Sequence, residues 1–205
     1  KTRKPLKIFH SLYAVNKFFN DEHASYRIIN SLKEPLCHRY VGFRWAYTKD
    51  EDYKLPILSD EEFAKRWLAV EYKSKQGYDD FQELYTEQGE RVRSKSEKII
   101  ADKLYHMGIP YRYEYPLVLQ DNIKIYPDFT ILKMPEREEV YLEHFGMMDA
   151  PDYVRNVMRK LNTYEKNGVY LGVNLFVTYE SVKYPLNTKG VEALLRQLFY
   201  IDKAG

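Results

Sequence analysis

Two acidic residues stand where the surrounding sequence is apolar. Asp128 follows Pro127 and opens a short apolar stretch, and Glu143 lies inside the stretch VYLEHF, residues 140–145. Glutamate is depleted in strands, and a buried ionised carboxylate needs a partner that offsets its lost hydration. His144 would point to the opposite face of the same strand, where we expect a packed, hydrogen-bonded side chain. The structural alternatives are a turn aspartate and a solvent-facing glutamate on an edge strand.

A third acid, Glu97, precedes these two in the chain. Ser94 and Glu97 match the capping box at the start of a helix, which is a sufficient structural explanation. Glu97 also stands at helical spacing from Ile100, Ala101 and Leu104, beside the apolar face of its own helix. Mg²⁺ binds a few carboxylates, keeps several waters and bridges to phosphate oxygens. The three acids together therefore predict a magnesium site.

The elements that must position these acids follow a regular order in the second part of the chain. We expect helices and strands over these residues, in the order αβββαβα: 94–107, 111–119, 128–133, 140–145, 151–167, 173–179 and about 188–200. Three consecutive strands indicate an antiparallel meander, and a helix then crosses over to a further strand. The sequence therefore predicts an α/β fold in which helices flank a mixed sheet with an αβββαβ core.

The first part of the chain, residues 1–88, is predicted to be mainly helical. A helix is expected over 24–33, a strand over 39–47, and a further helix after the capping box formed by Ser59 and Glu62. This part contains no recognisable catalytic group, so we expect it to pack on or position the domain formed by residues 89–205.

The composition of the chain says more about its cellular compartment than about its function. The 205 residues carry a net charge of +2, which does not by itself require a polyanionic partner. Cys37 is the single cysteine, which excludes an internal disulfide or a Cys/His zinc cluster and favours a reducing compartment. The sequence contains no apolar run near the roughly 18–20 residues that cross a membrane, and its start lacks the features of a signal peptide. We therefore expect a cytoplasmic protein.

Tyrosine is unusually frequent, with 20 residues in the chain. Tyrosine suits half-buried edges because its ring packs while its hydroxyl group stays hydrated. Exposed tyrosine rings can also stack on nucleic-acid bases. The sequence leaves both interpretations open.

Taken in order, several segments resemble the PD-(D/E)xK nuclease superfamily, which has the restriction-endonuclease-like fold. The resemblance covers roughly residues 88–180 and rests on GERVRSKSEKIIADKL, IPYRYEYPL, YPDFTI and YLEHFG. These stretches are similar to bacterial nuclease-like domains, some of which are associated with helicases. The resemblance implies metal-dependent cleavage of nucleic acid, with DNA favoured over RNA and a helicase or other DNA-processing protein as a partner. Asp128 and Glu143 would hold Mg²⁺ or Mn²⁺, and Glu97 would be an additional ligand or an orienting acid.

The sequence departs from the superfamily at the catalytic lysine. That lysine normally stands two residues after the strand acid, and here the position is Phe145. Lys160 is our candidate replacement, because it shares a helix face with Tyr153, Val157 and Tyr164, and the superfamily includes members with a lysine on this helix. The alternatives are a lysine that only packs its stem, and a catalytically inactive module that binds nucleic acid or a protein.

A cluster of basic residues surrounds the start of the helix that carries Glu97. Basic side chains and a helix N-terminus both suit phosphate groups. We therefore expect nucleic-acid contacts from Arg91, Arg93, Lys95 and Lys98. The alternative is a solvated charged segment, because a charge cluster alone does not define a binding site.

Overall fold

The computed structural model describes residues 15, 24–33, 39–40, 43–44, 59–75, 77, 83–119, 123–134 and 136–199. The chain divides into two compact units, Lys1–Val70 and Glu71–Gly205. The described residues of 71–88 therefore group with the second unit, and the domain boundary after residue 88 stays a prediction. No helix within the described ranges is long and apolar enough to cross a membrane. Cys37 lies outside the described residues.

The first unit contains short elements. They are α2 (Ala24–Lys33), β1 (Arg39–Tyr40), β2 (Phe43–Arg44) and α3 (Asp60–Leu68). The prediction of one strand over 39–47 is wrong, because β1 and β2 are two short strands that pair antiparallel with each other. The predicted capping box is confirmed, since Ser59 accepts from the N–H of Glu62 and its own N–H donates to the Glu62 carboxylate. Phe63 and Trp67 form the buried face of α3.

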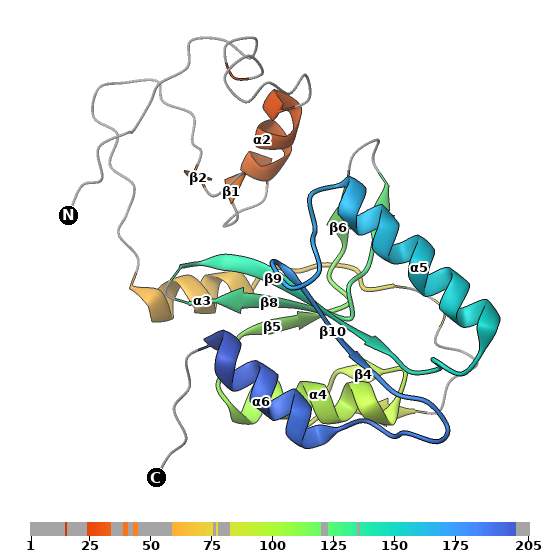
Figure 1. Ribbon diagram of the computed structural model, residues 1–205. Coiled ribbons are helices and arrows are strands. Elements are labelled where there is room, and N and C mark those ends of the chain that lie inside the picture. The colour runs from red at the N-terminus through yellow and green to blue at the C-terminus, as the bar shows by residue number, and fades with distance from the viewer. Residues whose placement is uncertain are drawn as a thin grey trace, which may run out of the picture. The chain divides into compact units, whose positions relative to one another are not determined.

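The second unit is a mixed α/β structure around a four-stranded sheet (Figure 1). Its elements are β3 (Leu84–Tyr85), β4 (Arg91–Val92), α4 (Lys95–His106), β5 (Tyr111–Tyr113), β6 (Leu117–Val118), β7 (Lys124–Ile125), β8 (Phe129–Lys133), β9 (Glu138–Phe145), α5 (Pro151–Lys166), β10 (Leu175–Tyr179) and α6 (Thr188–Phe199). The strand order is β10-β9-β8-β5. Antiparallel pairing joins β5, β8 and β9, and α5 crosses over so that β10 lies parallel to β9. The predicted meander, crossover and mixed sheet are confirmed.

The strand predicted over residues 111–119 is interrupted at Glu114. This residue adopts a left-handed backbone conformation with φ of 47°, which is unfavourable for a residue with a Cβ atom. Its N–H donates to the carbonyl oxygen of Asp128 at 3.0 Å, so the chain leaves the sheet beside that acid. Residues after the interruption form β6, which pairs with β7 in a separate two-stranded sheet.

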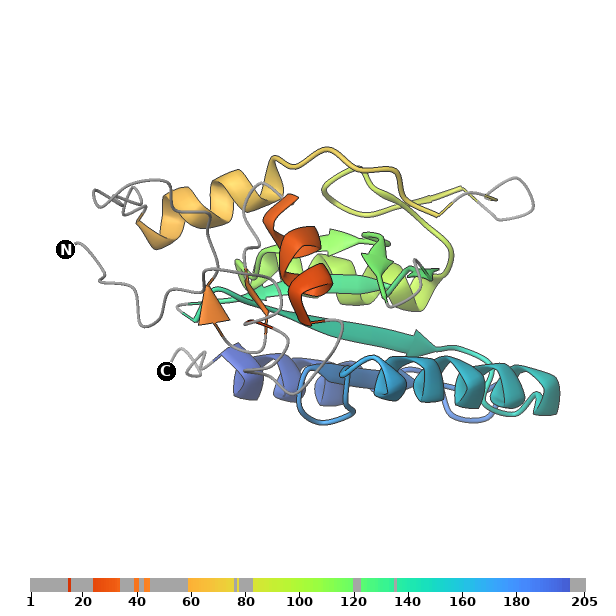
Figure 2. The same ribbon diagram turned by 90° about the horizontal axis from the view of Figure 1, so that it is seen from above.

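Helices cover both faces of the four-stranded sheet (Figures 1 and 2). Phe129 and Leu142 belong to the core cluster that includes apolar residues of α4 and α6. On the other face, Tyr164 of α5 packs with Leu175 and with the half-buried ring of Tyr141. Side chains alternate along a strand, so an inward Leu142 requires its neighbour in β9 to face α5. The hydrophobic pattern of β9 therefore places the Glu143 carboxylate on the sheet face that α5 covers.

We expect Leu142→Ala to lower the free energy of unfolding by about 2–5 kcal/mol, because it leaves a cavity in a fully packed core. Leu142 is 1% exposed, whereas Leu171, a matched control, is 51% exposed. Chemical denaturation followed by circular dichroism measures both variants. A loss for Leu142→Ala no larger than that for Leu171→Ala would contradict the assigned core face.

Candidate functional site

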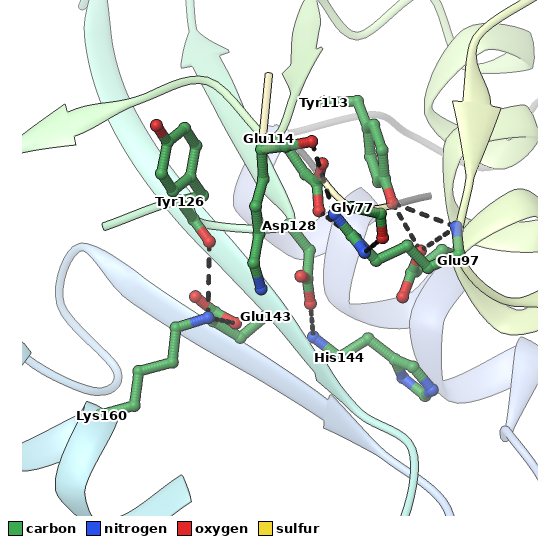
Figure 3. A network of polar contacts seen from close by, with 11 residues as sticks. Gly77, Glu97, Tyr113, Glu114, Tyr126, Asp128, Glu143, His144 and Lys160 are labelled. Atoms are coloured by element: carbon green, nitrogen blue, oxygen red, sulfur yellow. Dashed lines mark hydrogen bonds and ion pairs between the residues drawn. The ribbon is translucent and has the colours of Figure 1, made fainter. Parts of the chain in front are cut away.

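The sheet register brings Asp128 and Glu143 together. Phe129 of β8 pairs with Leu142 of β9, and one further step in this antiparallel register places Asp128 beside Glu143. The Asp128 carboxylate accepts a hydrogen bond from the main-chain N–H of His144 at 2.6 Å (Figure 3). The two acids thus meet where β8 begins and β9 ends, on the sheet face that α5 covers.

The Glu143 carboxylate is buried, with its side chain 1% exposed, and has partners for both oxygens. The Lys160 ammonium lies 2.6 Å from Oε2, and the Tyr164 hydroxyl group donates to Oε1 at 2.5 Å. Lys160 also donates to the carbonyl oxygen of Tyr126 at 3.4 Å (Figure 3). Positions four residues apart share a helix face, so α5 presents Lys160 and Tyr164 together. Lys160 therefore does more than pack its stem and extend into solvent.

Burial and neighbouring charges perturb the acid–base properties of this group. Burial, followed by the negative charges of Glu143 and Glu97, raises the pKa of Asp128 well above its usual value, and the positive charge of Lys160 only partly opposes this. Burial would lower the pKa of Lys160, but the charges of Glu143 and Asp128 outweigh it and raise that pKa. Lys160 therefore stays charged at neutral pH. The raised pKa of Asp128 shows that the site still favours an added proton or cation.

Glu97 takes a different position from the two strand acids. Its Oε2 accepts from the N–H of Arg93 at 2.9 Å and from the Tyr113 hydroxyl group at 2.7 Å. Ser94 caps the helix through the Glu97 N–H, but the Glu97 carboxylate turns to Arg93 and not to the cap residue, so the capping box is only half formed. Its charge nevertheless acts on Asp128.

The structure therefore assembles a pair of acids with a third at its side. Across the described ranges, the side chains of His, Cys, Asp and Glu form no group of three or more that could hold a metal ion. Mg²⁺ in proteins is often bound through one or two carboxylates, with water or phosphate oxygens completing its shell. Asp128 and Glu143 fit this requirement. Both carry hard oxygen donors, and the positive charge near Asp128 only partly offsets its burial and its acidic neighbours.

The four basic residues at the start of α4 differ in their surroundings. The Arg93 guanidinium pairs with Glu114 at 2.7 Å and donates to the carbonyl oxygen of Gly77 at 2.9 Å. Lys98 pairs with Asp102 one turn later on α4 at 2.6 Å. Arg91 is half-buried, and Lys95 is exposed. Contacts of these residues with nucleic acid stay a prediction.

Glu114 and Tyr153 also belong to this region, although neither is among the site residues predicted from the sequence. Glu114 pairs with Arg93 across 21 residues of sequence. The Tyr153 hydroxyl group accepts from the N–H of Gly146 at 3.2 Å, and burial together with the charge of Asp128 raises its pKa. The sequence feature that could have pointed to Glu114 is an acidic residue inside the aromatic run YRYEY, residues 111–115. For Tyr153, the sequence shows only that it shares a helix face with Lys160.

His144 lies on the opposite strand face and is hydrogen-bonded, as predicted. Its Nδ1 is 3.0 Å from the Thr178 hydroxyl oxygen, and its Nε2 is 3.2 Å from a Glu180 carboxylate oxygen. The Ser96 hydroxyl group also donates to Glu180 at 2.8 Å. Burial raises the pKa of Glu180, but the hydrogen bonds from Ser96 and His144 outweigh it and lower that pKa. These contacts fix the His144 side chain, and the main-chain N–H of the same residue donates to the Asp128 carboxylate.

The chain matches no family model and no curated protein. Among solved structures, it is similar to part of a DrdV–DNA complex determined by cryo-EM, with 16% identity and a TM-score of 0.33 over 52% of this chain. The similarity spans 11% of that chain.

We expect Asp128→Asn to raise the melting temperature of the metal-free protein at pH 7. A raised native pKa means that ionised Asp128 destabilises the fold, and this cost grows as pH rises from the ordinary carboxyl range towards the native pKa. The gain should disappear below the ordinary carboxyl range, where the aspartate is protonated in both states.

Differential scanning fluorimetry across pH, with and without Mg²⁺, tests this expectation. Mg²⁺ should raise the melting temperature of the wild type and not of Asp128→Asn. Asp152→Asn is a suitable control, because the Asp152 side chain is 90% exposed. If Asp128→Asn is instead less stable than the wild type, by the same amount at every pH, the ionised Asp128 carboxylate does not destabilise the fold.

Proposed function

We propose that this chain is a Mg²⁺-dependent nuclease that hydrolyses phosphodiester bonds, with DNA as the favoured substrate. The observation that carries the proposal is the 2.6 Å contact between Lys160 and Glu143 directly beside Asp128. Two acids and a lysine are the groups that the resemblance to PD-(D/E)xK nucleases implies. A mixed sheet with helices on both faces and the strand order β10-β9-β8-β5 is consistent with the restriction-endonuclease-like fold implied by that resemblance.

Each group has a defined chemical role in this proposal. Asp128 and Glu143 would hold Mg²⁺ or Mn²⁺, which as a Lewis acid supplies charge stabilisation at phosphate and lowers the pKa of bound water. Lys160 keeps its proton because its pKa is raised, so it acts as a fixed positive charge and not as a general base. A phosphate oxygen that gains negative charge would be stabilised by this ammonium group. Tyr164 orients the Glu143 carboxylate through its hydroxyl group.

Phe145 stands where superfamily members carry the catalytic lysine, but its ring belongs to the core. Phe145 is 5% exposed, so its ring is part of the packed interior. In this proposal the ammonium group that superfamily members place through a residue at this position would come from Lys160, which lies 2.6 Å from the Glu143 carboxylate. This spatial replacement supports an active nuclease.

A binding module without chemistry is the second candidate. Both oxygens of Glu143 already have protein partners, so the site is satisfied at that residue without a metal. A module of this kind would bind nucleic acid in a salt-dependent manner and would not cleave it with any metal ion.

We expect the wild type to cleave DNA with Mg²⁺ or Mn²⁺ and to be inactive in EDTA. Asp128→Ala and Lys160→Met should each reduce the rate at least about 100-fold, because each removes a group that stabilises charge in the transition state. Lys166→Met is the matched control, since Lys166 lies on the same helix and is exposed. It should keep wild-type activity.

The assay uses supercoiled plasmid, single-stranded and duplex oligonucleotides, and RNA. Gel electrophoresis over time distinguishes internal cuts from degradation at ends. Full activity of Asp128→Ala would overturn the nuclease assignment. Metal-independent binding of the same substrates without any cleavage would favour the second candidate.

A further inference from the structure

The connection between β10 and α6 exposes a group of aromatic and apolar side chains. We call residues 179–184, Tyr-Glu-Ser-Val-Lys-Tyr, the tyrosine turn. Tyr179 is 68% exposed, Val182 is 94% exposed and Tyr184 is 65% exposed. The Lys183 ammonium lies 5.4 Å from the centre of the Tyr184 ring. Two rings, one aliphatic tip and one cation therefore face solvent within six consecutive residues.

Main-chain hydrogen bonds hold the tyrosine turn in shape. The N–H of Ser181 donates to the carbonyl oxygen of Tyr184 at 2.9 Å, and the N–H of Tyr184 donates back at 3.2 Å. The N–H of Val182 donates to the Asp149 carboxylate at 3.2 Å, which ties the turn to the segment before α5. A preformed turn lowers the entropy cost of ordering its exposed side chains on a ligand.

The tyrosine turn lies at the same end of the sheet as Asp128 and Glu143. Main-chain bonds join Glu180 to Phe145 at 2.9 Å and Met148 to Glu180 at 3.1 Å, only a few residues after Glu143. Gly146, between Phe145 and Met148, donates to Tyr153 on α5. In both views of the ribbon, the start of α5 and the β10–α6 connection lie at one end of the sheet (Figures 1 and 2). Tyr179, the first residue of the turn, pairs with Phe145, two residues after Glu143.

We propose that the tyrosine turn binds unpaired bases of a nucleic acid, with Tyr184 as the stacking platform and Lys183 as a phosphate contact. The substrate class rests on the proposed function. Aromatic rings beside a cation are the usual means of holding single strands without sequence preference. A purely apolar protein partner would not need the lysine beside the ring, and its binding would not involve the neighbouring acid pair. A base-stacking surface explains the rings, the cation and the location together.

The test is the affinity for a fluorescently labelled single-stranded DNA in EDTA, where a metal-dependent enzyme cannot cut. Tyr184→Ala should weaken binding about 10-fold, in the range reported for loss of one stacked base. Tyr184→Phe should bind like the wild type, because it keeps the ring. Tyr170→Ala is the matched control, since Tyr170 is 51% exposed and lies before β10, at the opposite end of that strand.

Salt dependence separates stacking from charge. Lys183→Gln should reduce the slope of log affinity against log salt by about 0.7, the value for one phosphate contact on a single strand. Tyr184→Ala should leave that slope unchanged. A 2-aminopurine base in the oligonucleotide should lose fluorescence on binding to the wild type and to Tyr184→Phe, but not to Tyr184→Ala.

The outcomes distinguish this inference from the nuclease assignment. Tyr184→Ala that folds and binds single-stranded DNA like the wild type would overturn the stacking role, even if the wild type cleaves DNA. Absence of binding to any single-stranded oligonucleotide would also overturn it and would leave a protein partner as the occupant of the turn. Tyrosine-dependent binding by a wild type that never cleaves with Mg²⁺ would support this inference while the nuclease assignment fails.

Discussion

The contact between Glu143 and Lys160 is the interaction on which the rest of the second unit depends. Glu143 is a fully buried carboxylate in the interior of β9, and such a charge is tolerated only with a close cation and further hydrogen bonds. Lys160 and Tyr164 provide both, and both come from α5. The crossover helix must therefore lie on this face of the sheet, and its return places β10 parallel to β9. Removal of one partner from a buried pair of this kind typically costs about 3–5 kcal/mol.

Strand β9 serves the core and the candidate site at the same time. Leu142 packs towards α4 and α6, whereas Glu143 faces α5. Because neighbouring side chains of a strand point to opposite faces, Glu143 can face α5 only if Leu142 faces the core. His144 links the two faces, because its ring is held by Thr178 while its main-chain N–H binds Asp128. Asp128 is the member of this group whose charge is least compensated, as its raised pKa shows.

Local features of the second unit were predictable because their signals lie within short stretches of sequence. The helical period of α5 placed Lys160 and Tyr164 on one face, and the short connection between β8 and β9 brought Asp128 near Glu143. Contacts between distant residues were not predictable in this way. The pairing of Arg93 with Glu114 spans 21 residues and depends on a left-handed residue that interrupts a predicted strand. Arg93, expected at a phosphate, is already held by that carboxylate.

By itself, the sequence determined the order of the helices and strands and the presence of two acids in a hairpin, since propensity and periodicity are local properties. Only the tertiary structure decided which cation pairs with Glu143. Lys160 reaches Glu143 across 17 residues because the crossover of α5 packs one helix face onto one sheet face. The spacing of residues along the chain does not specify that packing, because it results from burial of the whole helix against the sheet.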